Sequence, residues 1–362
     1  MKKTKLMKVL AVTMGLTVAI AMLGGCGSSK SSSSSKSSGS SKYTKETLKL
    51  ALSTGDKSNW NTAAKYFGKL INKDTNGAVT VKTYPSDQLS NGDQAGGVQN
   101  LMDGTTDLSI HSNIIYGGLD DMFSVVSLPF LYSNTADVDK ILQGDGFQAL
   151  SKEADKKGVK LLAIGENGFR DVTNSKREIK TPSDMKGLKI RVAGSTVVLN
   201  AFKDWGADYT KANWSEVYTG LQTGTYDGQE NPIPTADSSS IQEVQKYVTD
   251  WTGSYDCLLF GMNKDKFNAM PKAEQQLFIK DAKKAMKYQR ELNRKQTKQM
   301  LTKWEKKDGI KVHKTTSAEA AQFKKLSDKG YTSYAKLLVK DGHSKSEVKE
   351  YLAKFGVKNI NF

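Results

Sequence analysis

The chain has 362 residues, and its 54 Lys and Arg against 38 Asp and Glu give a formal net charge of +16. Seven lysines and no acids lie in residues 1–42, so the remainder carries 16 − 7 = +9, spread along polar helix faces. This distribution is typical of a solvated surface rather than a nucleic-acid-binding one, and it suits an anionic ligand or an anionic membrane surface.

Residues 1–25 are predicted to form a secretory signal peptide. Four lysines in the first eight residues precede an apolar run over 9–23, and the residues LGGC that follow end in Cys26. This pattern is that of a lipobox, and the apolar run is shorter than the ~20 residues that span a membrane. We expect a lipid on Cys26 and a Ser/Gly/Lys tether over 26–44 that cannot bury apolar surface.

The remaining residues are numerous enough for two domains with their own cores. After Cys26 the chain has one cysteine, Cys257, so this part must rely on its core rather than on a disulfide. Cys257 lies in the apolar run YDCLLFGM, which predicts a strand. We therefore expect Cys257 to be a buried small hydrophobe rather than a reactive thiol.

The first half of the body alternates strand and helix patterns, which predicts an α/β fold that begins with a parallel sheet. Apolar residues from Trp60 to Ile71 recur at helical spacing, and the segments on either side have the short apolar runs of strands. The predicted elements are a strand at 48–53, a helix at 60–71, a strand at 78–85, a helix at 91–102 and a strand at 106–112.

In the second half, a long strand is predicted from Lys160, and we expect the chain to enter a second domain along it. The run at 247–263 has a strand pattern and is expected to cross back. From Pro271 to about residue 307 no further Pro or Gly interrupts a helical pattern. A helix of this length extends about 50 Å, so we expect it to cross both domains. A strand near 310–314 and two or three amphipathic helices follow.

Polar residues at the carboxyl ends of two predicted strands are candidate ligand contacts, because ligands bind beyond these ends in parallel α/β sheets. Ser53 follows the first strand, and His111 and Ser112 end the third. Each of them could equally be an ordinary turn-forming residue.

A second group of candidates lies between residues 170 and 231. Arg191 ends the predicted strand GLKIRV, where its guanidinium can bind a carboxylate with two parallel hydrogen bonds. Arg170 lies where the chain leaves the first domain, and Asn231 precedes a proline that favours extended backbone. Trp214 begins a helix for which Asn213 and Glu216 form a capping-box pattern. A solvated Arg191, an ion-paired Arg170 and a Trp214 packed in the core are the structural alternatives.

The sequence has none of the catalytic motifs of hydrolases, phosphate-binding loops or zinc proteases. His111, His313 and His343 share no metal-ligand spacing. We therefore predict no metal, no cofactor and no enzymatic activity.

Two blocks, GFRDVTNSKREIKTPSDMKGLKIRV and EVYTGLQTGTYDGQENP, resemble the solute-binding proteins of TRAP (tripartite ATP-independent periplasmic) transporters, of the dicarboxylate-binding type. The likeness extends from about residue 45 to the C-terminus. It implies a two-domain periplasmic-binding-protein-like fold with strands and a long helix crossing both domains. We expect domain 1 to comprise 45–168 and 257–296, and domain 2 to comprise 169–256 and 297–362.

The resemblance also implies the ligand contacts. The family's carboxylate-binding arginine falls on Arg191, its second ligand-side arginine on Arg170, its aromatic on Trp214 and its motif asparagine on Asn231. The family's ligand positions in the first domain fall on Ser53 and Ser112. The resemblance implies Asn and Glu at these two positions in members that bind sialic acid, so sialic acid is not expected here.

The expected function is capture of a small carboxylate outside the cytoplasm by a monomeric lipoprotein, anchored to the outer face of the cell membrane through Cys26. The expected partner is a TRAP-type permease. Three alternatives stay open: a carboxylate-sensing lipoprotein that feeds a sensor kinase, a surface-anchored enzyme that acts on a carboxylate, and an adhesion lipoprotein with a vestigial cleft.

Overall fold

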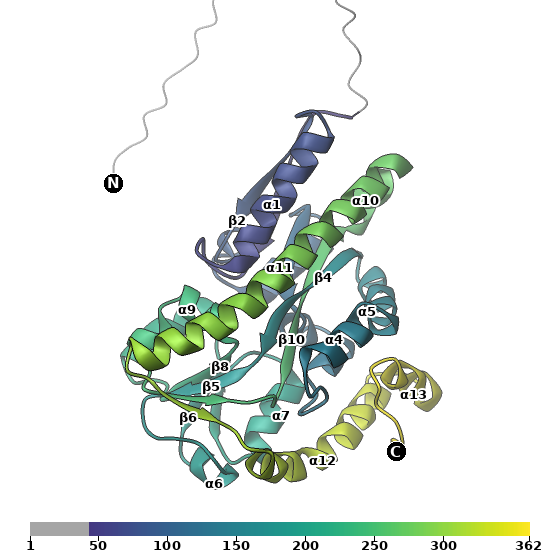
Figure 1. The fold of residues 1–362 in the computed structure, drawn as a ribbon. Coiled ribbons are helices and arrows are strands. Elements are labelled where there is room, and N and C mark those ends of the chain that lie inside the picture. The colour runs from purple at the N-terminus through teal and green to yellow at the C-terminus, as the bar shows by residue number, and fades with distance from the viewer. Residues whose placement is uncertain (1–42) are drawn as a thin grey trace, which may run out of the picture. The chain divides into compact units, whose positions relative to one another are not determined.

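The computed structural model describes residues 43–362; the predicted signal peptide, Cys26 and all but the last two residues of the tether lie outside the described residues. The described residues form two mixed sheets covered by helices (Figure 1). Within this range no helix has the length and apolar character needed to cross a membrane.

The first sheet has five strands in the order β2-β1-β3-β10-β4. Strand β1 pairs in parallel with β2 and β3, whereas β10 runs antiparallel to both β3 and β4. The predicted β-α-β-α-β start and the long strand from Lys160 are thus confirmed. The bounds are β1 Glu46–Leu52, β2 Val79–Tyr84, β3 Leu108–Ser112, β4 Val159–Phe169 and β10 Tyr255–Asn263.

The second sheet has six strands in the order β11-β9-β5-β8-β6-β7. Strand β6 is parallel to β7 and β8, and β5 is antiparallel to β8 and β9. The last strand of the chain, β11, adds to the edge beside β9. The bounds are β5 Asp171–Asn174, β6 Lys189–Val192, β7 Asp208–Lys211, β8 Gly228–Asn231, β9 Tyr247–Asp250 and β11 Lys311–Lys314.

Helices cover both sheets, and several begin with a side-chain cap such as Ser58 before α1 or Thr316 before α12. The α-helices are α1 Asn59–Asp74, α2 Gln94–Met102, α3 Asn113–Gly117, α4 Thr135–Leu142, α5 Asp145–Lys156, α6 Pro182–Met185, α7 Thr196–Asp204, α8 Trp214–Gln222, α9 Ile233–Ser238, α10 Lys264–Ala269, α11 Lys272–Lys306, α12 Ser317–Lys340 and α13 Lys345–Ala353. Short 3-10 helices are η1 Gln88–Ser90, η2 Asp121–Ser127 and η3 Ile241–Glu243.

The chain crosses between the sheets along β4–β5 and β9–β10, as predicted. Only Arg170 separates β4 from β5, and residues 251–254 separate β9 from β10. The predicted continuous strand over 247–263 is therefore two strands in different sheets. We call these two crossings the hinge.

Helix α11 also crosses between the sheets, as Figure 1 shows in green. Its 35 residues extend about 52 Å at 1.5 Å per residue. Phe278 and Ala282 in its first half pack in the core of the first sheet, whereas Trp304 near its end packs beside α8 and α9. The length and course predicted from the absence of Pro and Gly after Pro271 are confirmed.

The C-terminal helices contact the cores of both sheets. Phe323 of α12 packs against Trp205 and Trp251 beside the second sheet. Leu338 of α12 and Leu352 of α13 belong to the cluster that lies on the first sheet. The domain limits given above stay a prediction.

A joint of buried amides fastens α11 to β4 next to the hinge. The side chain of Gln289 accepts a hydrogen bond from the backbone nitrogen of Glu166 (2.8 Å) and donates to its carbonyl (2.7 Å). It also donates to Asn59 Oδ1 at the start of α1 (3.0 Å). Since Gln289 is fully buried, these groups have no access to water if its amide is removed.

We therefore expect Gln289→Met to lower the free energy of unfolding by about 2–5 kcal/mol, because buried partners would be left without hydrogen bonds. The matched control is Gln299→Met, an exposed position on the same helix, which should change stability by no more than about 0.5 kcal/mol. Urea unfolding measures both variants. Equal effects would show that the joint does not stabilise the fold.

Candidate functional site

A small cavity lies between the two sheets beside the hinge. Its volume is about 20 Å³, which is room for roughly one water molecule. Six of the seven predicted ligand contacts line it: Ser53, Ser112, Arg170, Arg191, Trp214 and Asn231. These residues come from both sheets, so an organic acid can enter only if the two sheets move apart.

Arg191 lies on β6 with its guanidinium buried, and it is 1% exposed. Leu188, Ile190 and Val192 face the apolar core on the other side, as the alternation predicted. Its Nε and Nη2 atoms both donate to the carbonyl oxygen of Ala212, at 3.0 and 2.6 Å. The guanidinium also lies 5.6 Å from the centre of the Trp214 ring, within cation–π range.

The outer edge of the Arg191 guanidinium has no protein partner. Nη1 forms no hydrogen bond to any residue in 43–362, and the side chain forms no ion pair there. Burial lowers the pKa of Arg191 to about 10, which Glu230 partly offsets. The side chain therefore stays charged at neutral pH, as a buried cation whose two-nitrogen edge is free to bind a carboxylate.

The charge of Arg170, in contrast, is neutralised by carboxylates of the protein. Its Nε and Nη2 atoms donate to the Glu230 carboxylate, Nη2 also donates to the Glu230 carbonyl (2.8 Å), and Nη1 donates to Asp256. Burial alone lowers the pKa of Arg170, but these two carboxylates outweigh it and raise the pKa above its ordinary value. Because Glu230 lies on β8 and Asp256 on β10, Arg170 joins the two sheets. One N–H on Nη1 remains for a ligand.

Two further polar groups in the cavity wall lack a partner among the described residues. Ser53 Oγ and Trp60 Nε1 are both buried without a hydrogen bond. Because both also line the cavity, they are candidate hydrogen-bond partners for a ligand. The apolar stripe over 60–71 predicts Trp60 only as a packing residue of a helix. It is the second residue of α1, the helix that follows β1, and this place at the start of the helix is the signal that could have identified it.

The sheets contact each other across the cavity mouth through the first residues of α2 and α8. Gln94 Oε1 accepts from the backbone nitrogen of Trp214 (3.1 Å), and Asn213 Oδ1 accepts from that of Gln94 (3.4 Å). The expected capping box of Asn213 with Glu216 is therefore wrong: the Asn213 side chain makes no cap and is used across the cleft instead.

The seventh predicted contact, His111, does not line the cavity. It is fully buried on β3, and its Nε2 lies 2.8 Å from Asp87 Oδ1 on the side that faces α2. The neighbouring Ser112 points the other way along the pleat and donates to Asp256 (2.6 Å). This alternation, which strand geometry requires, separates the two residues.

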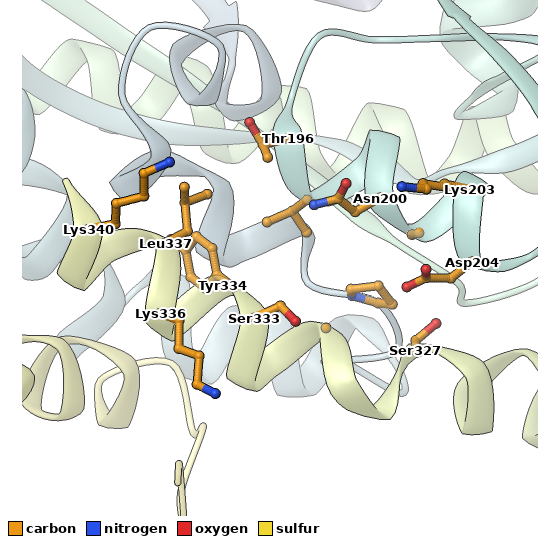
Figure 2. A pocket seen from close by; sticks show the side chains of 14 residues that line it. Thr196, Asn200, Lys203, Asp204, Ser327, Ser333, Tyr334, Lys336, Leu337 and Lys340 are labelled. Atoms are coloured by element: carbon orange, nitrogen blue, oxygen red, sulfur yellow. The ribbon is translucent and has the colours of Figure 1, made fainter. Parts of the chain in front are cut away.

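A larger groove of about 460 Å³ lies between α7 and α12 (Figure 2). Three lysines, Lys203, Lys336 and Lys340, reach its rim, and all are exposed. Its buried hydroxyl groups are all paired: Ser327 donates to the Phe323 carbonyl and accepts from Trp205 Nε1, and Tyr334 donates to the Asp121 carbonyl. The groove thus offers solvated charges but no unpaired buried group, so the small cavity is the better ligand site.

Within residues 43–362 no group of three or more His, Cys, Asp or Glu side chains could hold a metal ion. Cys257 is a free thiol, and burial raises its pKa well above the ordinary value. It is therefore an unreactive core residue, as predicted.

Comparison with known proteins identifies the family. The model of the bacterial extracellular solute-binding proteins, family 7, matches residues 50–337. The 2,3-diketo-L-gulonate-binding periplasmic protein YiaO of Escherichia coli K12 is 36% identical over 247 residues, which cover 68% of this chain and 75% of the relative.

Solved structures agree in fold. A TRAP periplasmic solute-binding protein from Ralstonia eutropha H16, with bound (S)-2-acetolactate, matches with a TM-score of 0.80 and 31% identity, over 86% of this chain and 98% of that one. The sugar acid binding protein of Advenella mimigardefordensis, in complex with galactonate, matches with a TM-score of 0.79 and 29% identity over the same shares. The chain therefore belongs to family 7 of the bacterial extracellular solute-binding proteins, which are the solute-binding components of TRAP transporters.

Proposed function

We propose that this protein captures a small organic acid outside the cytoplasm and delivers it to a TRAP-type permease. One observation carries the proposal: the buried guanidinium of Arg191 presents a free edge to a cavity and has no carboxylate partner within residues 43–362. A buried cation without a counter-ion is unfavourable. An organic anion would supply the missing charge together with two hydrogen bonds.

The relatives support an organic acid as the ligand. Those described above are named for, or hold, diketogulonate, acetolactate and galactonate, and all three ligands carry a carboxylate. Among the described residues that line the cavity, the titratable side chains are Arg170 and Arg191, with no carboxylate or imidazole for acid–base chemistry, so we propose binding without turnover.

The proposed mechanism is closure on the ligand. The cavity is too small for an organic acid in the form described, and its walls belong to sheets joined by the hinge. Contacts from both walls to one ligand favour the closed form, because a ligand shifts a conformational equilibrium towards the state that it binds more tightly. We propose that the closed, loaded protein is a monomer and is the form that the permease recognises.

Arg191→Ala should weaken ligand binding by roughly 30-fold to several thousand-fold. Truncating one partner of a buried charge pair costs about 2–5 kcal/mol, and about 1.4 kcal/mol corresponds to tenfold in affinity. Arg191→Lys should also bind poorly, since it keeps the charge but loses the planar edge. Calorimetry with an organic acid found by a thermal-shift screen measures both. Normal binding by Arg191→Lys would show that the site detects charge alone.

Arg191→Met should leave the ligand-free protein as stable as the parent or more stable by about 1–2 kcal/mol. Removing a buried unpaired charge is favourable, and losing the hydrogen bonds to Ala212 offsets part of that gain. Because burial lowers the folded-state pKa of Arg191 to about 10, the cost of the charge applies in full below pH 10. It is lost progressively as the pH rises from 10 towards the ordinary pKa of an arginine.

Thermal unfolding at pH 7 tests this expectation. The matched control is Arg177→Met, an exposed arginine that also donates to backbone carbonyls and should shift stability by about 0.5 kcal/mol or less. If Arg191→Met instead unfolds several degrees below the parent without ligand, the guanidinium is stabilising and is not held in reserve for an anion.

We propose that a lipid on Cys26 anchors the protein to the outer face of the cell membrane. The LGGC sequence after a short apolar run motivates this. Cys26→Ala should release the protein from membranes or leave it unprocessed, which cell fractionation and gel migration detect. A variant that fractionates and migrates like the parent would exclude lipid attachment at this position.

A further inference from the structure

Asn231, in the cavity wall, ends a chain of buried polar side chains that passes through the second sheet. Asn231 Nδ2 donates to Gln229 Oε1 (3.1 Å), and Gln229 Nε2 donates to Thr173 Oγ1 (2.9 Å). The Thr173 hydroxyl in turn donates to Gln245 Oε1 (2.8 Å). None of these four side chains is more than 4% exposed. We call Gln245, Thr173, Gln229 and Asn231 the amide relay.

The backbone fixes the direction of the relay at its far end. Gln245 Nε2 donates to the carbonyl oxygens of Val244 (2.8 Å) and Asp227 (3.4 Å). A reversed amide would place Gln245 Oε1 against these two oxygens, which is repulsive, so Oε1 must face Thr173. The Thr173 hydroxyl has a single proton. The hydroxyl donates that proton to Gln245 Oε1, so Thr173 can only accept a hydrogen bond from Gln229.

The hydrogen bonds of the relay also fix the orientation of Asn231 in the cavity wall. Gln229 uses its Nε2 on Thr173 and so presents Oε1 to Asn231. Asn231 must therefore donate through its Nδ2. Its Oδ1 then has no hydrogen-bond donor anywhere in the described part of the chain. Asn231 is 4% exposed and lines the cavity, where a donor from a ligand would satisfy this carbonyl oxygen. A ligand hydroxyl can supply the proton, whereas a keto group or a carboxylate cannot.

Charges limit the number of carboxylates that the cavity can hold. The cluster of Arg170, Glu230 and Asp256 contains one cation and two carboxylates, and burial raises the pKa of Asp256. The cluster thus disfavours further negative charge. Arg191 is the one cation of the cavity wall without a carboxylate partner among residues 43–362, so it can neutralise one ligand carboxylate.

The outer part of the cleft is no better suited to a second carboxylate. A space of about 380 Å³ adjoins the cavity and shares Gln94 and Ile115 with it. Its charged lining residues are Asp93, Glu216 and Lys211, two acids against one base. A polar, uncharged end of a longer ligand fits this lining better than an anionic end does.

We propose that the ligand is a hydroxylated monocarboxylic acid, whose carboxylate binds the free edge of Arg191 and whose hydroxyl donates to Asn231 Oδ1. Gln245, Thr173 and Gln229 act as positioning residues that hold Asn231 in this orientation. The inference rests on the proposed function and assigns the substrate class of the same site.

Calorimetry with a fixed panel tests the substrate class. D-gluconate, L-gulonate and D-galactonate represent the hydroxylated monocarboxylates, and succinate, fumarate and L-malate represent the dicarboxylates. We expect the tightest acid of the first group to bind at least about tenfold more tightly than any of the second, since a site built to bind a hydroxyl discriminates strongly. A dicarboxylate as the tightest ligand would overturn the inference, and Lys211→Met would then show whether Lys211 binds its second carboxylate.

Thr173→Val tests the relay, because it keeps the side-chain shape and removes the hydroxyl. The measured quantity is the ratio of the affinities for the tightest sugar acid and for hexanoate, obtained by competition. We expect this ratio to fall about tenfold, with hexanoate binding changed by no more than about twofold. The matched control is Thr249→Val on the adjacent β9: Thr249 is equally buried, but its hydroxyl donates to the Ile179 carbonyl outside the relay.

The outcomes separate the two proposals. An unchanged ratio in Thr173→Val, or an equal fall in Thr249→Val, would overturn the role of the relay. If none of the six acids binds but an organic acid without a hydroxyl group does, the inferred substrate class is wrong and the proposed function stands. If no organic acid binds at all, the proposed function itself fails.

Discussion

The site depends on one buried charge that the protein itself does not neutralise. Moving a guanidinium out of water is expensive, and most buried arginines are therefore paired with carboxylates. Arg191 has only the Ala212 carbonyl as a hydrogen-bond partner in the described residues. The apolar residues that alternate with it on β6 hold the strand in place, so the guanidinium cannot turn to solvent. The fold thus maintains an unfavourable charge, which the proposed anionic ligand would neutralise.

Arg170 and Arg191 lie in the same cavity wall but have different roles. Its two carboxylate partners come from different sheets, and they make it part of the hinge. Glu230 also accepts a hydrogen bond from the backbone nitrogen of Ala193, just after β6 (3.1 Å). The hinge cluster is therefore connected to the strand that carries Arg191. This connection gives a physical route by which motion at the hinge and the position of Arg191 can be coupled.

Much of the fold could be predicted because its signals are local. The uninterrupted pattern after Pro271 predicted α11, and the apolar stripe from Trp60 to Ile71 predicted α1. The break within 247–263 was missed because both halves have strand composition, and the change of sheet depends on contacts with distant strands. The Asn213 cap failed for a similar reason: Gln94, which is 119 residues away, takes its side-chain oxygen.

The site was predictable in position but not in detail. Strand ends and motif positions brought six residues to one cavity, yet nothing in the sequence near His111 signals its pairing with Asp87. Trp60 belongs to the apolar stripe of α1 and packs in the core of the first sheet, so its spacing gave no sign that its Nε1 lacks a partner among the described residues. The amide relay could not be predicted at all. Its direction follows from two hydrogen bonds, one between residues that are 56 positions apart in the sequence and one between residues that are 72 positions apart. Only the folded chain brings these residues together.

We propose that Arg191 carries the charge that the ligand neutralises. This is measured most directly by a crystal structure of the protein in complex with the organic acid that stabilises it most. We expect the ligand carboxylate in the plane of the guanidinium, within hydrogen-bond distance of both Nη1 and Nη2 of Arg191, with the hydrogen bonds to Ala212 retained. A carboxylate bound instead at Arg170 or Lys211, with the Nη1–Nη2 edge of Arg191 still unpaired, would contradict it.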